Sequence, residues 1–125
     1  MAGTGEGKAE FVEHRQKLSE DRVALDHAAA QGDLSTARTL LASIRARLDT
    51  IEKKTSAMNM VDRQSTALQI ATARRTMTEA ERYIDSGDAE SARAQITQLN
   101  GILAEIDTLL DRTIKGSIPD APSTG

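Results

Sequence analysis

A repeated turn is the feature that most constrains the fold of this chain. Residues 31–51, QGDLSTARTLLASIRARLDTI, are echoed in residues 86–106, SGDAESARAQITQLNGILAEI, with Gly32 and Gly87 at matching positions. A glycine can end one helix in the left-handed conformation, and an aspartate after it can cap the free N–H groups of the next helix. Each copy therefore predicts a helix, a very short turn and a second helix.

Apolar residues follow each turn in alternating steps of four and three, which places them on one stripe of a helix. The two stripes are Ala37, Leu41, Ile44, Leu48 and Ile51, and Ala92, Ile96, Leu99, Leu103 and Ile106. Similar stripes precede the turns, through Phe11, Leu18 and Leu25 and through Ile70, Ala73, Met77, Ala80 and Ile84. Two amphipathic helical hairpins bury their apolar faces best against each other.

The sequence thus predicts an all-α, up-down-up-down four-helix bundle built from two αα-hairpins. The expected helices lie near 8–31, 34–57, 60–86 and 88–115. Residues 8–115 form the bundle domain, 1–7 a flexible N-terminus, and 116–125, with two prolines and no periodicity, a disordered tail. Phe11 and Tyr83 are the only aromatic residues, so the core must be aliphatic.

The join between the hairpins leaves an alternative open. Neither Gly nor Pro occurs between Asp33 and Ser86, so the inner helices could form one continuous helix of about 80 Å, giving three helices in all. Against this, the apolar stripe breaks after Met58, and Asn59 is suited to cap a new helix. We favour the broken helix.

Composition excludes several classes of protein. The chain has no cysteine, which excludes disulfides, thiolate metal sites and cysteine nucleophiles. Its net charge of -3 provides no general attraction to nucleic acid or anionic lipid. No segment is a membrane span, and MAGTGEGKAE lacks the regions of a signal peptide. We expect a cytoplasmic protein, with secretion without a cleaved signal peptide left open.

Two short segments resemble known families. QGDLSTA (31–37) resembles the turn of a tetratricopeptide repeat, but that family repeats every ~34 residues with helices about half as long, so the likeness implies shared turn chemistry. HRQKLS (14–19) resembles the His-x-x-Lys-Gly pattern of histidine phosphotransfer domains, which implies a phosphorylated His14. Leu18 stands where that pattern has glycine, and the resemblance covers six residues only.

Metal and enzyme chemistry have little support in the sequence. Glu10, Glu13, His14 and His27 fall on the first helix, but the two histidines point to different sides of it, and the paired Glu-x-x-His motifs of di-iron bundles are absent. There is no Gly-rich phosphate loop and no nucleophile motif. We therefore predict no cofactor, no metal and no catalytic site.

Arginines on the inner helices suggest a basic patch, formed by Arg38, Arg45, Arg74 and Arg75, with Arg47 nearby. Such a face could contact phosphates, but aromatic residues for base stacking are missing. Acids are concentrated on the outer helices, so pairing of opposite charges between neighbouring helices is the more economical interpretation. Nucleic acid is an unlikely partner.

The last helix carries no charge between Arg93 and Glu105. Beside its core stripe, Gln95, Gln98 and Ile102 form a strip that continues to Leu109, and Gly101 would permit close approach of a partner helix. The alternative is that Ile102 and Leu109 are internal, because a bundle helix buries a wide face.

The sequence therefore favours a non-catalytic module that binds another protein through this strip, as an adaptor, chaperone-like or regulatory protein. A self-associating structural protein, in which the partner is a second copy of the chain, is the second hypothesis. Nucleic-acid binding is the third.

Overall fold

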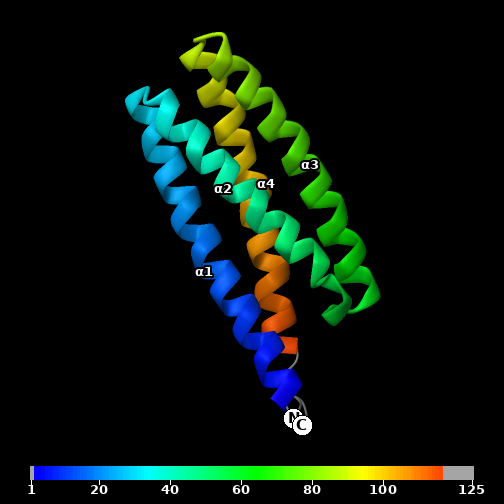
Figure 1. The fold of residues 1–125 in the computed structure, drawn as a ribbon. Helices are drawn as coiled ribbons and strands as arrows, with labels where there is room; N and C mark the ends of the chain where they lie inside the picture. Colours follow the sequence, from blue (N-terminus) through cyan, green and yellow to red (C-terminus); the bar gives the residue numbers. More distant parts are fainter. Residues whose placement is uncertain (1, 117–125) are drawn as a thin grey trace.

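The chain folds into a bundle of four helices, joined in an up-down-up-down order (Figure 1). The computed structural model describes residues 2–116, with side chains for residues 11–56 and 58–115. The helices are α1 (Ala2–Gln31), α2 (Leu34–Lys53), α3 (Met60–Asp85) and α4 (Ala89–Gly116). Each helix packs against the next, and α1 closes the bundle against α4. The predicted fold class is confirmed.

Two helix bounds differ from the sequence prediction. Helix α1 begins at Ala2 and not near residue 8, since extending an existing helix adds one hydrogen bond per residue without a new nucleation step. Helix α2 ends at Lys53, four residues before the expected end. The expected disordered tail lies, apart from Gly116, outside the described residues.

Both hairpin turns are built as the repeated Gly-Asp pair predicts. Gly32 and Gly87 have positive φ angles of 72° and 79°. The N–H of Asp33 donates to the carbonyl of Ala28 at 2.9 Å, and that of Asp88 donates to Tyr83 at 2.9 Å, closing a Schellman motif at each helix end. The same aspartates then cap the following helices, because Asp33 Oδ1 accepts from Thr36 N at 3.2 Å and Asp88 Oδ1 accepts from Ser91 N at 3.1 Å.

The join between the hairpins is broken, so the alternative with one continuous central helix is wrong. A single 3-10 turn, η1 (Thr55–Ala57), follows α2, and Met58 has extended backbone. Asn59 caps α3 by accepting from Asp62 N at 2.8 Å. Met58 is buried in the core, which holds the joining segment against the bundle.

An aliphatic core runs the length of the bundle. Every member of the two repeated stripes is fully buried, and Phe11 is the single aromatic residue in the core. The stripes preceding the turns are buried as well, except that Ile84 is only partly buried and packs against the core. The helical period of the sequence therefore determined which face of each helix points inward.

Candidate functional site

The strip predicted on α4 is divided between surface and interior. Gln98 and Gly101 are exposed, and Gln95 is half-buried. Ile102 is partly buried and packs against the core, and Leu109 is only 6% exposed. Leu109 is therefore not available to a partner, and for this residue the alternative prediction of an internal position is correct. No continuous apolar strip remains on the surface of α4.

The reason is the position of α4 against α3. Gln95 lies beside Thr76 and Glu79 of α3, and the spacing of seven residues places Ile102 and Leu109 on the same edge of α4. The facing side of α3 is built from small buried residues: Ala73, Thr76 and Ala80. The contact between α3 and α4 is the most extensive in the bundle, and this edge of α4 borders it.

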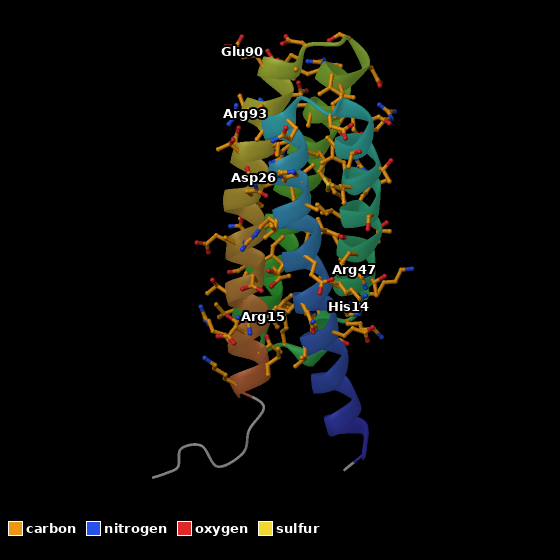
Figure 2. The ribbon with its side chains drawn as sticks, turned by 90° about the vertical axis from the view of Figure 1, so that its left-hand side faces the viewer. His14, Arg15, Asp26, Arg47, Glu90 and Arg93 are labelled. Carbon is orange, nitrogen blue, oxygen red and sulfur yellow. The ribbon has the colours of Figure 1, made fainter. Side chains whose placement is uncertain are left out.

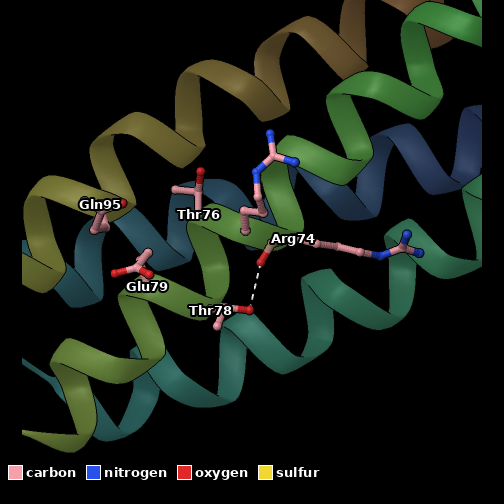
Figure 3. Close-up of a pocket in the computed structure, with 6 residues that line it drawn as sticks. Arg74, Thr76, Thr78, Glu79 and Gln95 are labelled. Atoms are coloured by element: carbon pink, nitrogen blue, oxygen red, sulfur yellow. Dashed lines mark hydrogen bonds between the residues drawn. The ribbon is translucent and has the colours of Figure 1, made fainter.

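A shallow depression of about 490 Å³ lies over the α3–α4 contact. It is lined by Arg74, Arg75, Thr76, Thr78, Glu79 and Gln95, and the side chain of Arg74 points away from Gln95 toward α2 (Figure 3). Thr78 Oγ1 donates to the backbone carbonyl of Arg74 at 3.0 Å, so this hydroxyl is used within its own helix. The depression is open and offers no enclosed set of polar groups for catalysis.

Three of the four arginines in the predicted basic patch pair with acids on the neighbouring helix. Arg38 pairs with Asp85. Arg45 Nη2 lies 3.0 Å from Glu81 Oε1. These contacts link α2 to α3 along their length, as the interpretation of charges pairing between helices predicts.

Arg74 contacts two carboxylates of α2. Its Nη2 lies 2.6 Å from Glu52 Oε1 and 2.5 Å from Asp49 Oδ1. The hydrogen bond to Glu52, followed by that to Asp49, raises the pKa of Arg74 above its usual value. Arg75, by contrast, is exposed and contacts only the hydroxyl of Thr72 at 3.4 Å. The four arginines therefore do not form one basic surface.

A second seam joins α1 to α4. Arg15 Nε donates to Asp107 at 2.8 Å and Arg15 Nη1 donates to Asp111 at 2.9 Å. The hydrogen bond to Asp107 contributes most to raising the pKa of Arg15, against the opposing effect of burial. A separate ion pair joins α4 to α3, because Arg112 Nη2 of α4 lies 2.8 Å from Asp62 Oδ1 of α3.

The two histidines lie in different surroundings. His14 Nδ1 is 3.1 Å from Arg47 Nη1 at the α1–α2 contact, and Figure 2 shows the two side chains together. His27 is exposed on the outer side of α1. Among the side chains that the structure describes, no group of three or more His, Cys, Asp or Glu residues could hold a metal ion.

Large apolar side chains remain exposed on two helices. Helix α1 exposes Val12 and Val23, at 48% and 65%. Helix α3 exposes Met60, Val61 and Leu68, at 64%, 68% and 63%. These residues lie outside the core stripes and were not among the predicted binding residues. The available signal was an isolated apolar residue opposite a stripe.

The fold and these surfaces define a four-helix bundle in which ion pairs join α2 to α3, α1 to α4 and α3 to α4. Comparisons with protein families, with curated proteins and with solved structures found no match. Within residues 2–116, no helix is both long enough and apolar enough to cross a membrane.

Proposed function

We propose that this protein is a non-catalytic helical module of the cytoplasm that binds another protein through the outer face of α3. The observation that carries the proposal is the pair Val61 and Leu68. They are seven residues apart, so they lie on one face of α3, and each leaves more than half of its surface exposed. Neither residue contributes to the core, so their exposure is not required by the fold.

The surrounding charges support a binding surface of defined character. We use the name α3 outer strip for Val61, Gln64, Leu68 and Arg75, which follow one another along this face. Asp62 is buried, and the next acid along the helix is Glu79. Within the strip, Arg75 is exposed and has no carboxylate partner among the described side chains. An apolar ridge with an unpaired cation beside it suits a partner helix that carries apolar and acidic residues.

The binding surface proposed here differs from the strip predicted on α4. Ile102 and Leu109 pack within the bundle, whereas Val61 and Leu68 do not. Nucleic-acid binding has weaker support, because Arg38, Arg45 and Arg74 are already paired with acids. A self-associating structural role would use the same α3 outer strip, with a second copy of the chain as the partner.

Site-specific photocrosslinking in the cells that make the protein tests this proposal. A photoreactive amino acid would replace Leu68 on α3 and, as a matched control, Ala46 on the exposed face of α2. We expect a defined crosslinked product from position 68 and none from position 46. Equal products from both positions, or no product from position 68, would show that α3 does not bind a protein.

A further inference from the structure

We propose that this chain also forms a dimer by exchanging hairpins, in which residues 34–85 of each copy become one continuous helix. The α1–α2 hairpin of each copy then packs against the α3–α4 hairpin of the other. We use the name exchanged dimer for this arrangement and closed form for that of Figure 1. The inference goes beyond the proposed function, because α3 keeps α2 and α4 as neighbours and its outer strip stays exposed in both arrangements.

The join between the hairpins departs from helical backbone at few positions. Residues 55–57 already form a 3-10 turn, and within residues 54–59 only Met58 and Asn59 are extended, with ψ angles of 157° and 166°. Neither Gly nor Pro occurs between Asp33 and Ser86. Rotation about these two ψ angles, with smaller adjustments around the 3-10 turn, therefore converts α2, the join and α3 into one helix of about 80 Å.

The buried residues of α2, the join and α3 keep one helical phase. On a straight helix of 3.6 residues per turn, all of them fall within an arc of about 120°. They are Ala37, Leu41, Ile44, Leu48, Ile51, Met58, Asp62, Thr66, Ile70, Ala73, Thr76, Met77 and Ala80. The closed form does not require a common phase, because a turn with extended residues lets the second helix begin at a new rotation about its axis. The exchanged dimer does require it, because its two bundles lie end to end on one side of the long helices.

The residues that pair α2 with α3 also share one side of the continuous helix. They occupy an arc of about 60° next to the buried one. The members are Arg38, Arg45, Asp49, Glu52, Arg74, Glu81 and Asp85. When two continuous helices lie antiparallel, this side of α2 faces the same side of α3 from the second copy. Each of these ion pairs can therefore form again between copies.

A second copy fits because the surface that receives it is the one already complementary within the closed form. Contacts between the hairpins, such as Arg15 with Asp107, become the same contacts between copies. Contacts within a hairpin are unchanged, among them Arg112 with Asp62 and the 2.9 Å hydrogen bond from Ser43 to Asp21. The two arrangements thus differ mainly at the join, which is the condition under which exchange costs little.

Two contacts favour the closed form at low concentration. Asn59 Oδ1 accepts from Asp62 N at 2.8 Å, and Met58 Sδ accepts from Thr66 Oγ1 at 3.3 Å. A continuous helix loses the Asn59 cap but pairs the first N–H groups of α3 with carbonyls of the join. Since both arrangements bury the same core, concentration decides between them. Conversion is slow, because the hairpins must separate first.

Two substitutions at the join should shift this balance in opposite directions. Met60→Pro suits the closed form, because Met60 is 64% exposed at the first position of α3, where proline is favoured, and Asn59 before it is extended. Inside a continuous helix the same proline removes a hydrogen bond and clashes with the preceding turn. Asn59→Ala removes the cap of the closed form and favours the continuous helix. Ala89→Pro, at the exposed first position of α4, is the matched control.

Sedimentation velocity measures the dimer after incubation at high concentration and dilution. We expect the unaltered chain to give a dimer that persists after dilution, and Asn59→Ala to give more of it. Met60→Pro should lower the association constant by about a hundredfold or more, because both long helices of the dimer carry the proline. Ala89→Pro should associate as the unaltered chain does. Circular dichroism would check that all the variants are folded.

Energy transfer within one chain distinguishes exchange from contact between two closed copies. The chain has no cysteine, so Thr39→Cys with Arg82→Cys provides the two exposed sites for a dye pair. In the closed form these positions lie near each other, beside the pair of Arg38 and Asp85. On one continuous helix they are about 65 Å apart. Labelled chain incubated with an excess of unlabelled chain should therefore lose energy transfer in the dimer and keep it in the monomer.

Three results would overturn the inference. One is that the unaltered chain and Asn59→Ala both stay monomeric at every concentration. Another is a dimer that keeps full energy transfer, which would consist of two closed copies. The third is a Met60→Pro variant that is folded and dimerises as strongly as the unaltered chain.

Discussion

At the residue scale, the two glycine-aspartate pairs hold the hairpins together through backbone conformation and capping. The glycines supply a φ angle that other residues adopt only with strain, and the aspartates accept the first free N–H groups of α2 and α4. These effects are local to a few residues. They can therefore be tested one position at a time.

Replacing Gly87 by alanine should destabilise the protein, whereas Gly101→Ala should stabilise it. A Cβ at either position meets nothing within 4 Å, so packing does not separate the two. Gly87 has a φ of 79°, which costs an alanine about 1–2 kcal/mol. Gly101 is helical and exposed, so alanine should gain about 1 kcal/mol. Urea unfolding measures both, and a loss of stability in Gly101→Ala would indicate that this glycine serves a contact.

The capping aspartates predict a fall in stability at acid pH. The hydroxyl and then the N–H of Thr36 lower the pKa of Asp33, and the N–H and then the hydroxyl of Ser91 lower that of Asp88, both from 3.8. A carboxyl whose pKa is lowered by folding contributes stability above its unfolded pKa and loses it as pH falls through the folded value. This contribution should therefore disappear as the pH falls below 3.8.

Denaturant midpoints at several pH values would measure this effect. The matched control is Asp33→Asn with Asp88→Asn, which keeps a capping oxygen but does not titrate. The difference in stability between the two proteins should shrink as the pH is lowered. A difference that is constant with pH would show that the caps do not depend on the carboxylate charge.

At the element scale, the helices are aligned by ion pairs between specific neighbours. Helix α2 is joined to α3 through Arg38, Arg45 and Arg74, and α1 is joined to α4 through Arg15. Most of these pairs are partly exposed, so each contributes modestly to stability. Their main consequence is the choice of neighbour, because the same charges in another arrangement would repel or remain unpaired.

Arg112 is an exception because its partner is buried. The side chain of Asp62 is 5% exposed, and its carboxylate also accepts from Asn59 Nδ2 at 3.2 Å. Arg112→Ala would leave this carboxylate without a cation, which should cost about 1–2 kcal/mol. Lys115→Ala, which removes an exposed pair with Asp111, should change stability by less than about 0.5 kcal/mol. Adding Asp62→Asn to Arg112→Ala should recover part of the loss, and no recovery would argue against the charge as its cause.

At the scale of the whole molecule, the two hairpins share one core. Residues from all four helices belong to a single buried cluster that runs along the bundle. The joining segment contributes Met58 to the same cluster. Neither hairpin encloses its own apolar face, so each depends on the other for stability.

Splitting the chain within the joining segment tests this dependence. Fragments 1–56 and 57–125 should each lack a cooperative unfolding transition when studied alone. Mixed in equal amounts, they should form a complex with the helical circular dichroism of the intact chain. Cooperative unfolding of either fragment by itself would show that a hairpin is an independent folding unit.

The sequence by itself determined the four helices, both hairpin turns, the break before Asn59 and the inward face of each helix. These follow from local rules, since helical period and capping act over a few residues. The tertiary structure decided how the edges of the helices meet. Leu109, for example, is only 6% exposed although it lies beside the core stripe of α4. Likewise, Arg74 is paired with acids of α2, whereas Val61 and Leu68 stay exposed. Which side of a helix meets a neighbour depends on contacts between residues distant in the chain, and no local sequence pattern specifies these contacts.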